Sequence, residues 1–315
     1  MKVYTDIDQF DPIKKAFVTT GTFDGVHLGH RVILKKIIEE AKKEGGESVL
    51  LTFYPHPRMV LFPEDTNLKL LTTQPEKIKL LEEIGLDHLI IQKFTPEFSR
   101  IRAYNYVRDI LVGKIGVHKL IIGYDHQFGR NREGSIEQLR EFTPLFNFKI
   151  EEIPAQDIDE VKISSTKIRK ALLEGDIESA DLYLGYSYCL SGEVIHGNQL
   201  GRKLGFKTAN IHLSNKHKLI PGDGVYAVYV VLNELVYKGM MNIGRRPSVE
   251  NPDANMSLEV HIFDFNEDIY NKVITVKFLK RIRDEKKFDS MEELSAQLHQ
   301  DKETINAYFS SKNAK

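Results

Sequence analysis

The sequence is poor in cysteine, in long apolar runs and in net charge. Its 315 residues include one cysteine, Cys189, which excludes an intramolecular disulfide and a cysteine-based zinc site. There is no stretch of about 18 apolar residues such as a membrane-spanning helix needs. The N-terminal segment MKVYTDIDQF is charged and has no apolar signal region, so we expect a cytoplasmic protein without a membrane partner.

The charges are balanced. Lysine and arginine total 44 and aspartate and glutamate total 45, which gives a net charge of −1. There is no polybasic run, so a nucleic-acid partner bound through its phosphates is not supported. Apolar residues make up 41% of the chain and charged residues 28%, as in globular proteins, and the length suggests two domains.

The two halves of the chain have different patterns. Up to about residue 183, short apolar runs alternate with helical patterns, which predicts a parallel sheet with helices on both faces. From residue 184 the runs are strand-like and separated by turns until SMEELSAQLHQDKETINAYF, where Met291, Leu294 and Leu298 form an expected inner stripe. We therefore predict a first domain over 1–183 and, over 184–315, a small antiparallel β-barrel with a C-terminal helix.

One segment at a predicted strand end is unusual. Residues 21–30, GTFDGVHLGH, place three glycines and two histidines between an apolar strand and a helical pattern. The free N–H groups and the dipole of a helix start attract anions, and Gly25 and Gly29 let a phosphate approach the backbone. His27 and His30 lie about one turn apart and can donate to phosphate oxygens. A metal-binding pair and ordinary capping histidines are the alternatives.

The pattern G-T-F-D-G-x-H-x-G-H resembles the nucleotidyltransferase signature, in which the H-x-G-H turn holds the phosphates of ATP. The resemblance implies transfer of a nucleotidyl group to a phosphate acceptor with release of pyrophosphate. It implies that His27 and His30 are catalytic and stabilise charge on the phosphates. The nucleotide-binding residues that it implies in this loop are Gly21, Phe23, Asp24 and Gly29.

A second segment, ISSTKIRKALLEGDIESADLYLG, opens with three hydroxyl residues before a helical pattern. An ordinary N-cap is one explanation. However, Lys167 and Arg169 in the first turn oppose the helix dipole, and a bound anion would resolve that conflict. Together, H-x-G-H and I-S-S-T-x-I-R resemble adenylyltransferases that act on FMN. The resemblance implies a catalytic Arg169 and nucleotide binding by Ser164, Ser165 and Thr166.

Two further loops are candidates for flavin binding. His56 lies between two prolines in TFYPHPRMV, where a purely structural turn is the alternative. In GYDHQFGRNREG, Asp125 and Phe128 are candidates to face a flavin or a ribose. The matching family loop more usually has an aromatic residue where His126 stands.

The second half contains the glycine-rich run GNQLGRKLGFKTANI within a β pattern. Gly197, Gly201 and Gly205 recur every four residues and can wrap phosphates. Thr208 and Asn210 are oxygen donors two residues apart on extended chain, so they point to one side and can hold Mg²⁺ between nucleotide phosphates. A turn and strand with routine polar residues is the alternative.

The pattern G-x-x-x-G-R-x-L-G-F-x-T-A-N resembles the riboflavin kinase signature, and PGDGVYAV and GMMNIGRRPSVE extend the match. The resemblance adds Arg202 to the nucleotide loop. The family usually has proline where Lys207 stands. In SLEVHIFDF, Glu259 alternates with Leu258 and Val260, and a solvent-facing carboxylate is the simple interpretation. By resemblance, Glu259 is the catalytic base that accepts the proton of the riboflavin 5′-hydroxyl.

These resemblances cover about residues 16–305 and identify the chain as similar to bacterial bifunctional riboflavin kinases/FMN adenylyltransferases. They imply a nucleotidyltransferase-like first domain, Mg²⁺ as cofactor, and ATP, riboflavin and FMN as small-molecule substrates. FAD is the implied end product, and flavoenzymes are its expected recipients. The alternatives are an FMN adenylyltransferase with a flavin-binding regulatory barrel, and a regulator without enzymatic activity.

Overall fold

The structure is a computed structural model that describes residues 1–65, 67–124, 126–154, 163–197, 204–245 and 256–313. By its internal contacts the chain divides into two units, residues 1–165 and 166–315. Each unit contains one sheet. The predicted domain boundary, between residues 183 and 184, lies further along the chain and stays a prediction.

The first unit contains a sheet of six parallel strands in the order β1-β4-β3-β2-β5-β6, which confirms the predicted parallel sheet. All residues of the central strand β2 are buried, as expected for a strand covered on both faces. The strands are β1 (Lys2–Tyr4), β2 (Ala16–Thr20), β3 (Glu47–Tyr54), β4 (His88–Lys93), β5 (Val117–Gly123) and β6 (Lys149–Ile153).

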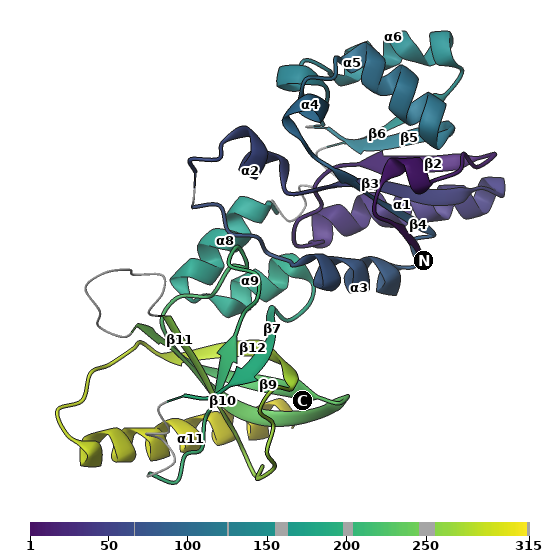
Figure 1. The fold of residues 1–315 in the computed structure, drawn as a ribbon. Coiled ribbons are helices and arrows are strands. Elements are labelled where there is room, and N and C mark those ends of the chain that lie inside the picture. The colour runs from purple at the N-terminus through teal and green to yellow at the C-terminus, as the bar shows by residue number, and fades with distance from the viewer. Residues whose placement is uncertain (66, 125, 155–162, 198–203, 246–255, 314–315) are drawn as a thin grey trace. The chain divides into compact units, whose positions relative to one another are not determined.

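Helices cover both faces of this sheet (Figure 1). The helices α1 and α3 pack on one face, where Leu34 and Leu81 join the buried side chains of the strands. On the other face lie α6 and the π-helical segment η2, through Leu139 and Val107. The helical segments are η1 (Ile7–Gln9), α1 (Leu28–Glu44), α2 (Pro57–Leu61), α3 (Gln74–Ile84), α4 (Pro96–Ser99), α5 (Ala103–Asn105), η2 (Tyr106–Ile115), η3 (Arg130–Arg132) and α6 (Ile136–Phe146).

The connections of β2 determine where a ligand can bind. From β2 the chain continues through α1 to β3 on one side, and β5 lies on the other side. The strand order therefore reverses at β2, and ligands of such sheets bind at the carboxyl ends of the strands beside this point. Residues 21–30 follow β2 directly, and the segment with Phe128 follows β5, so the two candidate segments leave neighbouring strands.

The described part of the second unit contains a closed six-stranded antiparallel barrel in the order β10-β11-β8-β7-β12-β9, which confirms the predicted barrel, with helices before and after it. A hairpin joins β9 to β10, where Asn233 and Glu234 form the turn with φ of 48° and 68°. The elements before the last helix are α8 (Ser165–Glu174), α9 (Ile177–Leu184), β7 (Cys189–Ile195), β8 (Ala209–His212), β9 (Gly224–Leu232), β10 (Leu235–Arg245), β11 (Met256–Ile262) and β12 (Val273–Arg283).

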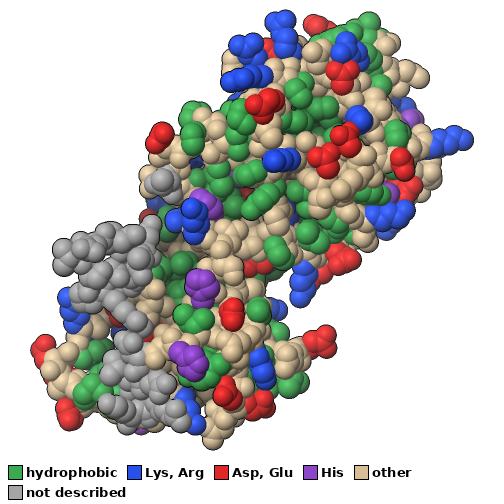
Figure 2. Space-filling view, viewed as in Figure 1, with side chains coloured by type: hydrophobic (Ala, Val, Ile, Leu, Met, Phe, Trp, Pro, Cys, Tyr) green, Lys and Arg blue, Asp and Glu red, His purple; other side chains and the backbone are tan. Residues whose placement is uncertain are grey.

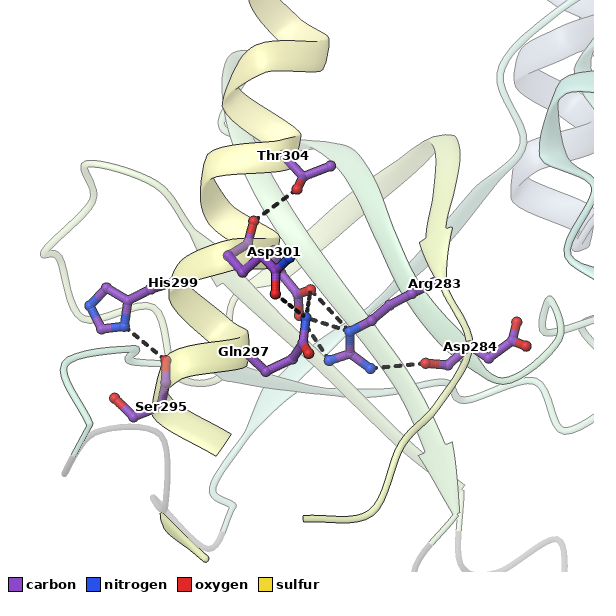
Figure 3. A network of polar contacts seen from close by, with 8 residues as sticks. Arg283, Asp284, Ser295, Gln297, His299, Asp301 and Thr304 are labelled. Carbon is purple, nitrogen blue, oxygen red and sulfur yellow. Dashed lines mark hydrogen bonds and ion pairs between the residues drawn. The ribbon is translucent and has the colours of Figure 1, made fainter. Parts of the chain in front are cut away.

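The C-terminal helix α11 (Met291–Asn313) packs against the barrel. Ile305 and Phe309 are 0% and 1% exposed and carry most of this contact. The predicted inner stripe was wrong at Met291, which is 41% exposed, because the burying face lies further along the helix. Polar contacts add to the packing where α11 meets the end of β12 (Figure 3).

Candidate active sites

The loop after β2 has an uncommon backbone. Phe23 and Val26 adopt positive φ values of 46° and 39°, which non-glycine residues seldom do unless their surroundings hold them there. Both side chains are buried in the core that α1 covers. The loop thus folds into a fixed shape before α1 begins at Leu28.

Asp24 holds this loop to the segment before α3. Its carboxylate is 2% exposed and accepts the backbone N–H groups of Leu71 and Thr72 at 3.0 and 3.1 Å. The Thr72 hydroxyl also accepts the N–H of Gly25 at 3.1 Å. Asp24 was predicted to contact nucleotide. In the structure its carboxylate organises the loop, and a nucleotide contact stays a prediction.

His27 and His30 lie together at the start of α1. His27 is the N-cap, and its Nδ1 accepts the backbone N–H of His30 at 3.3 Å, so the neutral His27 ring carries its proton on Nε2. The two rings stack with centroids 3.6 Å apart. Around them the described residues contain no group of three or more His, Cys, Asp or Glu side chains, so the metal-pair alternative has no third ligand of these types there.

The surroundings of His30 favour its neutral form. Burial lowers the pKa of His30 well below its usual value of 6.5, and the nearby His27 and Lys77 lower it further. Among the described residues, Nδ1 of His30 is buried without a hydrogen-bond partner. A neutral imidazole at a helix start can donate one hydrogen bond to a phosphate oxygen, which is the role predicted for it.

Lys77 on α3 was missed by the sequence analysis. Its side chain is 6% exposed, and its ammonium donates to the carbonyl oxygen of Thr22 at 2.7 Å. Burial lowers the pKa of Lys77, while the Asp24 carboxylate acts in the opposite direction. The signal was present, because Lys77 follows the Thr73 capping box near a helix start, where a cation opposes the helix dipole.

The predicted second phosphate segment forms the start of α8. Ser165, the last residue of the first unit, donates its hydroxyl to the carbonyl oxygen of Asp24 at 3.1 Å. Ser164 and Thr166 are exposed, and Arg169 is half-buried. Contact of these three side chains with nucleotide stays a prediction.

The flavin candidates lie in different settings. His56 caps α2, since its Nδ1 accepts the N–H of Arg58 at 3.2 Å. Phe128 is 7% exposed, and its ring lies 5.6 Å from the ring of Tyr106 in the core. Burial lowers the pKa of His126 to about 4, and this ring stacks on Phe128 at 6.0 Å. Asp125 lies outside the described residues.

Glu259 occupies a polar position on the barrel. Leu258 and Val260 are buried and Glu259 is half-buried, so the predicted alternation along β11 is confirmed. The Glu259 carboxylate accepts the hydroxyl of Ser257 at 2.6 Å and that of Thr208 at 3.3 Å. The simple interpretation of a solvent-facing carboxylate therefore does not describe its surroundings.

Two asparagines flank Glu259 on neighbouring strands. Asn210 on β8 and Asn242 on β10 are its partners in the strand register, and directly paired residues share one face of a sheet. The position of Asn210 beside Glu259 agrees with the predicted site, while Asn242 was missed. The polar face of the barrel is thus made of Thr208, Asn210, Asn242 and Glu259.

The first end of the predicted nucleotide loop, Gly197, lies against this face. A Cβ atom at position 197 would lie 2.1 Å from Nδ2 of Asn210, so a larger residue there would displace the Asn210 amide. Gly205 has φ of 80°, which also favours glycine. Gly201 and Arg202 lie outside the described residues.

A pocket of about 230 Å³ adjoins Thr208. Its walls include apolar side chains of β11 and polar residues of the turn after it. At its edge, the Lys207 ammonium donates to Oδ1 of Asn266 at 2.7 Å, and the Lys207 carbonyl lies 2.8 Å from Nδ1 of His261. Lys207, which stands where the family usually has proline, therefore lines the pocket.

The donor types around Thr208 suit a magnesium ion. Hydroxyl, amide and carboxylate oxygens come from Thr208, Asn210 and Glu259, and hard divalent cations prefer oxygen ligands. The glycine at position 197 leaves the Asn210 amide room on that side. The residues present therefore fit the predicted metal.

Each half of the chain matches a known protein family. A family model for FAD synthetase matches residues 10–167, and one for riboflavin kinase matches residues 184–309. A bifunctional riboflavin kinase/FMN adenylyltransferase from Buchnera aphidicola is 41% identical over 93% of each chain. One of the same name from Escherichia coli K12 is 37% identical over 95% of this chain and 94% of the relative, and one from Bacillus subtilis is 36% identical over 94% and 93%.

A solved structure matches nearly the whole length of the chain. It is described as a macrolide-efflux protein from Streptococcus pneumoniae, superposes with a TM-score of 0.87, and is 30% identical over 97% of this chain and 98% of that chain. Within the part of the chain that the structure describes, no helix combines the length and the apolar character needed to cross a bilayer.

A parallel sheet with a phosphate-type loop at its reversal point, followed by a polar-faced barrel, is the architecture of a two-domain nucleotide-using transferase. The chain belongs to the family of bifunctional riboflavin kinases/FMN adenylyltransferases, with the FAD synthetase part first and the riboflavin kinase part second.

Proposed function

We propose that the two reactions use the two sites described above, with domain limits of 1–183 and 184–315. The observation that supports this most directly is the set of His27, His30 and Lys77 around the helix start after β2. Such a set gathers N–H donors and positive charge where a polyphosphate would bind. The proposal includes a cytoplasmic location, because both reactions consume ATP.

In the barrel, riboflavin is phosphorylated. Glu259 accepts the proton of the 5′-hydroxyl while that oxygen bonds to the γ-phosphorus of ATP, and ADP leaves. Thr208 and Asn210 would hold Mg²⁺, which when bound supplies charge neutralisation on the phosphates. Ser257 and Thr208 orient the carboxylate through their hydroxyl groups. The loop between Gly197 and Gly205 covers the nucleotide.

In the first unit, FMN is converted to FAD. A phosphate oxygen of FMN bonds to the α-phosphorus of ATP. The bond between the α-phosphorus and the oxygen that bridges it to the β-phosphorus breaks, and pyrophosphate leaves. The nucleophile is the substrate itself, so the protein contributes position and electrostatics. His27 and His30 stabilise the phosphate charge, and Arg169 stays a candidate for the same role. His56, Asp125 and Phe128 stay candidates for the flavin side.

The test is a separation of flavins after incubating the purified chain with riboflavin and ATP, with and without Mg²⁺. We expect FMN and then FAD with Mg²⁺, and neither without it. If FMN forms without FAD, the proposed adenylyltransferase site is wrong. If FAD forms only from added FMN, the proposed kinase site is wrong. Unchanged turnover after chelation would contradict the proposed magnesium site.

A further inference from the structure

A buried cation lies beneath the loop of the proposed adenylyltransferase site. The Lys77 ammonium is 2.7 Å from the carbonyl oxygen of Thr22, and the same oxygen accepts the Thr52 hydroxyl at 3.2 Å. Thr52 belongs to β3 and Lys77 to α3. The carbonyl of Thr22 is therefore clamped between the sheet and a helix.

The clamp acts where the loop needs support. Thr22 directly precedes Phe23, which together with Val26 adopts a positive φ in this loop although neither residue is a glycine. Such backbone conformations are unfavourable and persist where neighbouring groups hold them. Asp24 fixes the next part of the loop through Leu71 and Thr72, so two separate anchors shape it.

The charge of Lys77 also reaches the histidines. Besides burial, its positive charge and the stacked His27 both lower the pKa of His30. Asp24 is the opposite charge near Lys77. A fixed cation in a site of low dielectric attracts phosphate groups more strongly than an exposed one. Lys77 is thus placed to act on both the shape and the charge of the loop.

We propose that Lys77 is a positioning residue for adenylyl transfer, because its ammonium holds the Thr22 carbonyl and with it the loop that presents His27 and His30 to the triphosphate of ATP. This inference rests on the proposed function of the first unit. Lys77 acts through the loop and does not contact the reacting atoms.

The test compares Lys77→Met with Lys79→Met in the full chain. Lys79 lies on the exposed side of the same helix and is the matched control. We expect Lys77→Met to lower kcat/KM for FAD formation from FMN about tenfold, with a higher KM for ATP. FMN formation by the barrel in the same preparation should not change, and Lys79→Met should leave both reactions unaltered.

A second readout separates positioning from simple packing. An NMR titration of the His30 ring, assigned with His30→Ala, should show a higher His30 pKa in Lys77→Met than in the wild type and in Lys79→Met. Lys77→Arg keeps the cation and should retain the low His30 pKa and recover FAD formation. If Lys77→Met does not fold, the comparison is made between Lys77→Arg, which keeps the positive charge, and Lys77→Gln, which removes it. If these two variants form FAD at the same rate and have the same His30 pKa, the inference is overturned.

The outcomes also separate this inference from the proposed function. If His30→Ala leaves FAD formation intact, the proposed site itself is wrong. If His30→Ala abolishes FAD formation while folded Lys77→Met keeps both normal turnover and the normal His30 pKa, only the role of Lys77 is overturned.

Discussion

The imidazole rings of His27 and His30 lie face to face, with centroids 3.6 Å apart and planes 15° apart. Two positive charges at this distance repel, and the start of α1 adds the positive end of a helix dipole. Without a bound anion, protonation of both rings is therefore unfavourable, and the pair offers N–H donors without carrying two positive charges. A polyphosphate is the kind of ligand that such a pair suits.

Replacing His30 with alanine should impair only the first unit. We expect His30→Ala to lower FAD formation from FMN at least tenfold, because a preorganised phosphate donor is lost, while FMN formation from riboflavin continues. Both rates are measured by separating the flavins. His118→Ala, at a partly exposed histidine that contacts Glu44, is the control and should leave both rates unchanged. Equal rates in His30→Ala and the control would contradict the assignment.

Replacing Glu259 with glutamine should have the opposite selectivity. Glu259→Gln keeps the size of the side chain but removes the base, so FMN formation should fall about a hundredfold. Formation of FAD from added FMN should persist, which the same chromatographic assay measures. Glu193→Gln, on β7 of the same barrel, is the control. Loss of both reactions in Glu259→Gln would instead indicate that the barrel is damaged.

Acid should destabilise the first unit through His126. Burial lowers its pKa to about 4, so on acidification the unfolded chain binds the proton first, and stability present above pH 6.5 is lost as the pH falls toward 4. The free energy of unfolding is measured by urea unfolding followed by circular dichroism. Between pH 7 and pH 5 it should fall by about 1.5 kcal/mol less in His126→Phe than in the wild type. His299→Phe, at an exposed position on α11, is the control; an equal loss in all three proteins would show that His126 does not contribute.

The barrel should depend on the ion pair between Arg283 and Asp301. Asp301 is 2% exposed and accepts Nε and Nη2 of Arg283 at 3.0 and 2.8 Å (Figure 3). Asp301→Ala leaves a partly buried guanidinium unpaired and should lower the free energy of unfolding of the second unit by about 3 kcal/mol. FMN formation should then be lost at a lower temperature.

The control for this prediction is an exposed pair. Lys114 and Asp8 also form an ion pair, but Asp8 is 72% exposed, so Asp8→Ala should change stability by at most about 0.5 kcal/mol. Similar effects of Asp8→Ala and Asp301→Ala in thermal unfolding would contradict the argument from burial. Lysine, arginine and acidic side chains are interspersed on the face shown in Figure 2. The exposed pair of Arg108 and Asp109 offers an additional control.

Much of the fold could be predicted from local patterns. The helix over 28–44 and its glycine stop follow from apolar spacing and the left-handed Gly45, and the hairpin follows from Asn233-Glu234. Where patterns were weak, the predictions failed. The short edge strand β1 was not expected, because it contains few apolar residues, and the apolar pattern of residues 16–23 continues past the end of β2 at Thr20.

The candidate sites were predicted only as far as local sequence reaches. Spacing along a single element was enough to predict that His27 and His30 lie about one turn apart at the start of one helix, and that Glu259 lies on the opposite face of its strand from Leu258. Spacing could not predict that Lys77 contacts the carbonyl of Thr22 or that Asn242 pairs with Glu259. Contacts of this kind depend on which distant segments pack together and in which register, and a one-residue slip between two strands would turn Asn242 to the other face.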